Sequence, residues 1–392
     1  MRQIKPNVFS IGAIDWDRRL FDELIPLPEG TSYNAYLVKG SDKVALLDTV
    51  EPTKADVLIG NLVSSGIDRI DYIVSHHAEQ DHSGSIPDVL ALYPEAKVVA
   101  NEKNKGMLIC HLHLEEDNFI TLKDGDTLSL GDKTLQFFDL PWVHWPETGG
   151  TYLQEDRIMF TCDFFGAHLA SSDLYVTNEF VVCEAAKRYY AEIMMPFRGP
   201  IKRNLAKLDT LDIDMIAPSH GPIYDKPELI FNSYKQWVSD EVKNEVVLPF
   251  VSMHHSVRAM VDHFVEALIE RNITVKPFDM AKADTGKLAI ALVDAATLVV
   301  GSPTVLSGAH PSAAYAVLLA NALRPKVKFA SIIGSYGWGG KMVEQLTSLM
   351  PYIKAEFLDP VVVQGMPRDE AFVLVDKLAD AILAKHQEIG IA

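Results

Sequence analysis

The chain of 392 residues lacks the features that define several protein classes. Its three cysteines, Cys110, Cys162 and Cys183, form no Cys-x-x-Cys pair. This excludes a disulfide scaffold, an iron–sulfur site and a zinc ribbon, and it favours a reducing compartment. The N-terminal residues lack the apolar stretch of a signal peptide, and no apolar run reaches the roughly 18 residues of a membrane span. We therefore expect a cytoplasmic protein with no membrane partner.

Basic residues are also scarce. The 36 Lys and Arg residues face 53 Asp and Glu residues, which gives a net charge of -17. Because phosphate contacts need clustered basic side chains, we expect no nucleic-acid partner. The 48% of apolar residues can build a large core, and a prior of about 150 residues per domain predicts two domains.

The charge divides the chain into two parts. Residues 1–245 carry 23 basic and 39 acidic side chains, whereas residues 246–392 carry 13 and 14. The segment 238–245 is polar and offers no apolar face to bury. We therefore place the domain boundary between residues 245 and 246.

The two parts also differ in their hydrophobic patterns. In the first part, Gly40-Ser41-Asp42 predicts a hairpin turn, and the β-rich runs lie at 31–38, 43–49, 70–75, 96–100, 134–140, 157–162 and 215–218. In the second part strands and helices alternate, with strands at 246–251, 274–280, 296–301 and 328–334 and helices at 257–271, 341–350 and 368–386. Such alternation predicts an α/β fold with a doubly wound parallel sheet. Pro249 argues against an interior position for the first of these strands, because proline removes a ladder hydrogen bond.

Possible metal ligands follow several strands of the first part. The segment 75–84, Ser-His-His-Ala-Glu-Gln-Asp-His-Ser-Gly, is taken alone as either a solvated polar loop or a metal-binding loop. A lone histidine in an apolar stretch, such as His144, is more often a core residue than a ligand. Together, however, the His and carboxylate side chains form one ordered series of the ligand types that first-row metals prefer. Its members are His77, Glu79, Asp81, His82, His144, Asp163 and His220.

Three loops of the second part follow predicted parallel strands, where doubly wound sheets bind ligands. A helix N-terminus with serine hydroxyls can hold a phosphate, glycines permit close approach to a ring, and Tyr336 and Trp338 can stack on it. No Gly-x-Gly-x-x-Gly follows a strand, which argues against a dinucleotide. The candidate residues are Ser252, Met253, His254, His255, Ser256, Val257, Ser302, Pro303, Thr304, Ser307, Gly308, Ser335, Tyr336, Gly337, Trp338 and Gly339.

The metal series resembles the metallo-β-lactamase-like family over about residues 30–225, except that Glu79 stands where the hydrolases have a second histidine. The extra carboxylate brings the ligand charge to about minus three, which favours iron over zinc. The loops of the second part resemble those of flavodoxins, which bind FMN, although Val257 replaces the usual threonine of the phosphate loop. The two together resemble the flavodiiron proteins, also called A-type flavoproteins.

That resemblance implies a metallo-β-lactamase-like αββα sandwich at 1–245 and a flavodoxin-like domain at 246–392. It implies that His77, Glu79 and His144 bind the iron nearer the flavin, that Asp81, His82 and His220 bind the second iron, and that Asp163 bridges them. The implied cofactors are FMN and two iron ions, and the implied activity is reduction of dioxygen to water, of nitric oxide to nitrous oxide, or of both. The implied partners are a separate electron donor, which is rubredoxin or a reduced deazaflavin or nicotinamide, and a second chain in a head-to-tail homodimer or dimer of dimers.

Two other functions are compatible with parts of the pattern. A dizinc hydrolase of the lactamase-like fold would use the second part only for dimerisation or regulation. A flavodoxin-type electron carrier would require a degenerate metal domain. Glu79 and the FMN-like loops argue against the first, and the complete ligand series argues against the second.

Overall fold

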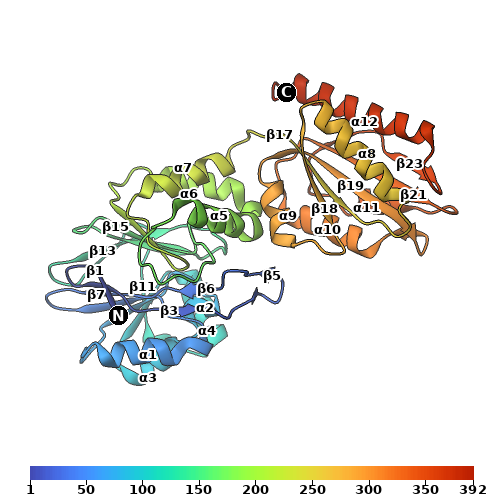
Figure 1. The fold of residues 1–392 in the computed structure, drawn as a ribbon. Helices are drawn as coiled ribbons and strands as arrows, with labels where there is room; N and C mark the ends of the chain where they lie inside the picture. The colour runs from blue at the N-terminus through green and yellow to red at the C-terminus, as the bar shows by residue number, and fades with distance from the viewer. The chain divides into compact units, whose positions relative to one another are not determined.

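The computed structural model describes residues 1–392, which form two compact units (Figure 1). Unit 1 comprises Met1–Tyr190 and Phe197–Val238, and unit 2 comprises Ala191–Pro196 and Ser239–Ala392. The domain boundary between residues 245 and 246 stays a prediction. The division into compact units describes contacts within the folded chain and does not test whether each part folds alone. None of the helices combines the length and the apolar character needed to cross a bilayer.

Unit 1 contains a seven-stranded sheet with the order β1-β2-β7-β8-β9-β10-β11. Its strands are β1 (Arg2–Lys5), β2 (Val8–Ser10), β7 (Tyr36–Lys39), β8 (Val44–Leu47), β9 (Tyr72–Val74), β10 (Lys97–Ala100) and β11 (Phe119–Thr121). The pairs from β1 to β8 are antiparallel, and those from β8 to β11 are parallel. The antiparallel pairing of β7 with β8 confirms the hairpin predicted at Gly40-Ser41-Asp42.

A second sheet of five strands has the order β12-β13-β14-β15-β16. Its strands are β12 (Thr127–Ser129), β13 (Thr134–Asp139), β14 (Gly149–Leu153), β15 (Ile158–Cys162) and β16 (Met215–Pro218). Two small antiparallel pairs join β3 (Ala13–Asp15) to β6 (Thr31–Tyr33) and β4 (Leu20–Phe21) to β5 (Ile25–Pro26).

The single strand predicted at 31–38 is wrong, because it is divided into β6 and β7, which lie in different sheets. The chain is held at Asn34 between them. The Asn34 side chain donates hydrogen bonds to the carbonyls of Pro218 and Gly221, and its backbone N–H donates to Ser219. These bonds turn the chain out of the first sheet and fix the loop that carries His220.

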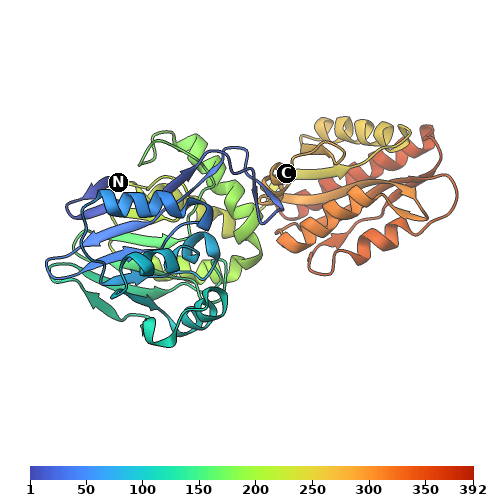
Figure 2. The ribbon, with the colours of Figure 1, turned by 90° about the horizontal axis from the view of Figure 1, so that it is seen from below.

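Helices cover the outer faces of the two sheets, which makes the αββα sandwich that the sequence predicts (Figures 1 and 2). The helices of unit 1 are α1 (Ala55–Ser64), α2 (Gln80–Ser83), α3 (Ile86–Leu92), α4 (Glu102–Leu112), α5 (Glu179–Tyr189), α6 (Arg198–Leu208) and α7 (Pro227–Val238). One core lies between the sheets and includes Val38, Val74 and Phe160. Another joins the first sheet to α1, α3 and α4. Burial on both sides keeps the strand ends rigid, so side chains that follow them have fixed positions.

Unit 2 is a parallel sheet with helices on both faces (Figure 2). The sheet order is β18 (Thr274–Asp279), β17 (Lys243–Phe250), β19 (Ala295–Val305), β21 (Phe329–Tyr336), with β22 (Glu356–Phe357) and β23 (Val361–Gln364) both pairing with β21. The helices are α8 (Ser256–Glu270), α9 (Thr285–Leu292), α10 (Pro311–Leu323), α11 (Met342–Ser348) and α12 (Asp369–Glu388). This order, with the first strand inside the second, confirms the flavodoxin-like doubly wound fold.

Two details of unit 2 differ from simple expectation. Pro249 lies in an interior strand, yet its neighbour Phe250 still pairs with Gly301, so the proline does not end β17. The prediction that the third strand ends at residue 301 is wrong, because β19 continues to Val305. The extension is stabilised by β20 (Gly308–Ala309), which pairs back on it through a two-residue turn at Leu306 and Ser307, both with positive φ.

Candidate functional site

Strand ends place the predicted metal ligands of unit 1 at one edge of the sandwich. Asp163 follows β15 directly, and His220 lies two residues after β16. His77 and Glu79 lie in the loop after β9, and α2, which begins at Gln80, carries Asp81 and His82. His144 lies between β13 and β14. The structure therefore brings all seven predicted residues together in two groups.

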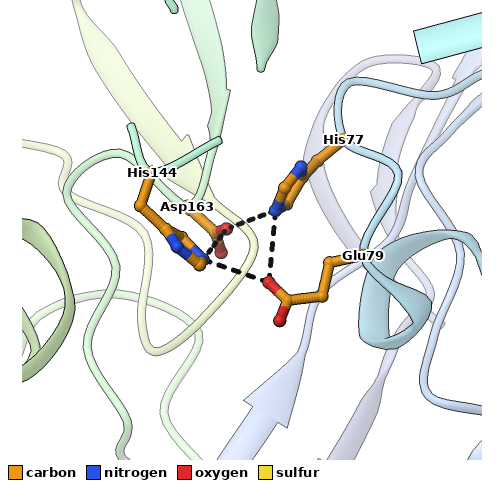
Figure 3. Close-up of side chains that lie close together, drawn as sticks. All are labelled: His77, Glu79, His144 and Asp163. Carbon is orange, nitrogen blue, oxygen red and sulfur yellow. Dashed lines mark hydrogen bonds and ion pairs between the residues drawn. The ribbon is translucent and has the colours of Figure 1, made fainter. Parts of the chain in front are cut away.

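The first cluster consists of His77, Glu79 and His144 together with one oxygen of Asp163 (Figure 3). Glu79 Oε2 lies 3.2 Å from His77 Nε2 and 3.0 Å from His144 Nε2. Asp163 Oδ2 lies 3.4 Å and 3.6 Å from the same two nitrogens. The four atoms thus point toward a common centre, which is the arrangement of donors around a metal ion.

The second cluster consists of Asp81, His82 and His220. His220 Nε2 lies 3.2 Å from Asp81 Oδ2, and His82 Nε2 lies 3.3 Å from Asp81 Oδ1. The other oxygen of Asp163, Oδ1, lies 2.9 Å from His82 Nε2 and 3.3 Å from His220 Nε2. One carboxylate therefore faces both clusters with different oxygens, which is the position of a bridging ligand.

Several buried oxygen and nitrogen atoms of the candidate ligands have no hydrogen-bond partner. These atoms are both oxygens of Asp81, both oxygens of Asp163 and both ring nitrogens of His82. Buried polar atoms are normally paired, because each unpaired one costs about 1–3 kcal/mol. One cation at the centre of each cluster would satisfy the carboxylates and imidazoles together, so the residues present fit a pair of metal ions.

The electrostatics of the clusters keep the Asp163 carboxylate ionised. Burial opposes the ionisation of Asp163, but His82 and His220 outweigh it and hold its pKa well below the ordinary value. Burial likewise opposes the protonation of His220, but Asp163 and Asp81 raise its pKa to about 10. The site attracts positive charge strongly, whether the charge comes from protons or from metal ions.

A further layer of buried groups, which the sequence did not identify as functional, surrounds the ligands. His77 Nδ1 donates to Glu147 Oε1 at 2.6 Å, and His220 Nδ1 donates to the Ser32 carbonyl at 2.7 Å. His168 packs on the ring of His220 with centroids 4.7 Å apart and lies 4.8 Å from the ring of Tyr189. These residues belong to no motif with a characteristic spacing. Only their burial, which the folded structure shows, distinguishes them from ordinary polar residues.

The other histidines of unit 1 fall into two classes. His111 and His113 are exposed near the end of α4. His76 and His168 are buried. Burial lowers the pKa of His168 well below its ordinary value, with a smaller contribution from His220, so the ring is neutral. Cys162 also lies within 4.8 Å of His82 and Asp163, and burial keeps its pKa well above the usual thiol value.

Unit 2 has a cavity of about 330 Å³ at the carboxyl ends of its strands. Such a volume lies within the usual range for cofactor pockets. Eight of the predicted flavin residues line it, namely Met253, His254, Ser256, Pro303, Thr304, Ser335, Tyr336 and Gly337. The lining also includes Gly365 and Met366 from the loop after β23, which the sequence did not predict.

The other eight predicted residues lie outside this lining: Ser252, His255, Val257, Ser302, Ser307, Gly308, Trp338 and Gly339. Several have structural contacts of their own. Ser252 Oγ accepts the Arg258 N–H at 3.1 Å, and Val257, in the first turn of α8, is buried in the core. Ser302 Oγ accepts the His310 N–H at 3.1 Å. The loop that holds Ser252 still precedes the N-terminus of α8, where backbone N–H groups can hold a phosphate.

Comparison with known proteins adds independent findings. Residues 31–221 match the family model described as "ODP family beta lactamase". A nitric oxide reductase of Moorella thermoacetica is 33% identical over 392 residues, which cover 97% of this chain and 98% of that protein. The solved structure of rubredoxin oxygen:oxidoreductase from Desulfovibrio gigas covers 98% of both chains with a TM-score of 0.95 and 27% identity. The flavodiiron protein from Giardia intestinalis covers 98% of both with a TM-score of 0.91 and 26% identity.

Proposed function

The chain belongs to the flavodiiron proteins, and from that premise we propose that it reduces dioxygen to water, nitric oxide to nitrous oxide, or both, with FMN and two iron ions. The observation that carries the proposal is the position of Asp163, whose two oxygens face two different ligand clusters. A bridging carboxylate of this kind fixes the separation of two metal ions, so that one small substrate can bind between them.

We assign the first iron to His77, Glu79 and His144 and the second to Asp81, His82 and His220, with Asp163 shared. Two ferrous ions and a reduced FMN together supply the four electrons that dioxygen needs to become water, or the two that couple nitric oxide. The three carboxylates would balance the positive charge of the metals. Burial keeps the pKa of Tyr189 well above its ordinary value, so its hydroxyl holds a proton close to Asp163.

We further propose that FMN occupies the cavity of unit 2. Its phosphate would lie at the segment 252–257, which leads into the first turn of α8, and Tyr336 would offer an aromatic face to the ring. The hydroxyls of Ser256 and Ser335 lie 2.8 Å apart and can turn toward the cofactor. No Asp, Glu, Lys or Arg lines the cavity, so binding would depend on shape, backbone donors and stacking rather than on full charges.

The remaining partners are proposals of the same kind. A separate donor, either rubredoxin or a reduced deazaflavin or nicotinamide, delivers electrons to FMN. A head-to-tail homodimer or a dimer of dimers brings the FMN of one chain beside the irons of another, because each proposed site lies at an edge of its own unit. A protein that is monomeric in solution and fully active over many turnovers would contradict the dimer.

The first experiment is a count of iron, zinc and FMN in protein purified without air, together with its visible spectrum. We expect about two irons and one FMN per chain. The rates of dioxygen and nitric oxide consumption then show which substrate is preferred. About two zinc ions without flavin would overturn the proposal and direct the search to the hydrolysable substrates of a dizinc hydrolase.

A further inference from the structure

We propose that Glu147 is a positioning residue that makes the two metal positions unequal. By strengthening His77 as a ligand, it would stabilise the oxidised state of the iron in the first cluster relative to the iron in the second. The inference rests on the proposed di-iron function, and it concerns a residue outside the ligand set.

The contact between Glu147 and His77 is short and fully enclosed. Glu147 Oε1 accepts the His77 Nδ1 proton at 2.6 Å, and neither side chain is exposed to solvent. The same oxygen accepts the Ala78 N–H at 3.1 Å, whereas Oε2 is buried and has no partner. Because no other group neutralises the carboxylate, its negative charge acts mainly on this imidazole and on the metal position beyond it.

The histidines of the second cluster have no comparable partner. His220 Nδ1 donates to the neutral carbonyl of Ser32 at 2.7 Å. His82 Nδ1 is buried and has no hydrogen-bond partner. A carboxylate behind a metal-bound histidine raises the basicity of the ligand, and a carbonyl does so less. The first cluster therefore receives extra negative charge, which favours the higher charge of an oxidised metal.

Glu147 also connects two ligand loops. It lies three residues after His144, and its backbone carbonyl accepts a hydrogen bond from the Asn101 side chain at 2.8 Å. Its side chain reaches the loop after β9, where it bonds His77 and Ala78. The residue thus fixes the orientation of His77 while it holds the segment of His144 in place.

The neighbouring residue provides a matched control. His76 Nδ1 lies 2.6 Å from Asp48 Oδ2, and the His76 N–H donates to Asp48 Oδ1 at 2.8 Å. His76 Nε2 bonds Thr151 Oγ1 at 3.1 Å, so its ring faces a hydroxyl and belongs to neither cluster. In both pairs a buried carboxylate lies 2.6 Å from a buried imidazole, but only Glu147 hydrogen-bonds a proposed metal ligand.

The test compares Glu147→Gln and Asp48→Asn with the wild-type holoprotein in a redox titration. The titration follows the mixed-valence iron pair by electron paramagnetic resonance, and melting temperature and iron content are measured on the same samples. If Glu147 stabilises the oxidised first iron, Glu147→Gln moves the two reduction steps closer together, and the maximal mixed-valence signal falls. Iron affinity falls by roughly 10-fold, the lower end of the range for such partners. Asp48→Asn should lower the melting temperature but leave the separation between the two reduction steps unchanged.

The outcomes separate the inference from the proposed function. Wild-type protein without two irons would contradict the proposed function itself. If Glu147→Gln keeps two irons and the separation between the two reduction potentials is unchanged, only the inference is overturned. The inference is also overturned if Asp48→Asn reduces this separation as much as Glu147→Gln does. If Glu147→Gln does not retain iron, Glu147→Asp is tested instead, because it keeps the negative charge at a greater distance from His77. We then expect a smaller decrease in the separation between the two reduction potentials. If this separation is unchanged in Glu147→Asp, the inference is also overturned.

Discussion

The two candidate sites are built from opposite materials. The candidate metal clusters of unit 1 contain three carboxylates and four imidazoles, most of them fully buried. The cavity of unit 2 contains no carboxylate and no permanently cationic side chain, and Met253 and Met366 on its rim are exposed. One site therefore binds through concentrated charge, and the other through shape and neutral hydrogen bonds.

This difference predicts how each site responds to change. Charge interactions at buried ligands are strong and mutually dependent, so the loss of one group alters the whole site. Contacts in an open neutral cavity are weak and numerous, so each contributes little by itself. Substitutions in unit 1 should therefore have large effects on both irons, and substitutions in unit 2 should have graded effects on FMN.

The largest effect is expected from Asp163→Ala. Because both clusters share this carboxylate, the variant should lose most of both irons and at least about 100-fold in gas reduction. FMN content should stay near the wild-type value, since the proposed flavin cavity belongs to the other unit. Metal analysis and rates of dioxygen and nitric oxide consumption measure these quantities. The exposed Asp68→Asn is the control, and retention of two irons by Asp163→Ala would contradict the bridge.

A substitution that preserves a ligand at the same position should change the metal instead of removing it. Glu79→His replaces a hard anionic ligand by a neutral imidazole in the first cluster. Because zinc accepts nitrogen ligands readily and iron gains more from the carboxylate charge, we expect the zinc-to-iron ratio to rise several-fold. The ratio is measured after expression in media that contain equal amounts of both metals. An unchanged ratio would show that Glu79 does not select the metal.

The charged clusters should also make the metal-free protein sensitive to pH. The pKa of His220 is raised to about 10, whereas an unfolded chain has the ordinary value of 6.5. Its pairing therefore stabilises the fold fully below pH 6.5, and this contribution is lost as the pH rises through about 10. Chelated protein should melt at progressively lower temperature between these values. Iron-loaded protein should show a weaker dependence, because the metal replaces the protons.

The sequence predicted which seven His and carboxylate side chains lie together at one rim, and it predicted much of the fold. Ligand types are few, and strands ending before Asp163 and His220 place them at one rim. Alternating strands and helices identified the doubly wound sheet of unit 2 in spite of Pro249. These features depend on local pattern and residue chemistry, which a sequence displays directly.

Other features depend on tertiary contacts and were missed. Glu147 follows His144 by three residues, but only the folded loop brings its carboxylate to His77. The division of the run at 31–38 depends on bonds from Asn34 to a loop more than 180 residues away. Half of the predicted flavin residues fall outside the cavity lining, because glycine and serine in a loop do not reveal which way the chain turns.

The smallest effects are expected in the flavin cavity, where two aromatic residues can be compared. Tyr336 lines the cavity, whereas Trp338 does not and is 71% exposed. If Tyr336 stacks on the FMN ring, Tyr336→Ala removes roughly 1 kcal/mol and weakens FMN binding by about 5-fold to 10-fold. Trp338→Ala should change it by less than about 2-fold. Fluorescence titration of flavin-free protein with FMN gives both dissociation constants, and iron content should not change in either variant. A larger loss in Trp338→Ala would mean that the ring binds outside the cavity, against the exposed tryptophan, and that shape alone does not define this site.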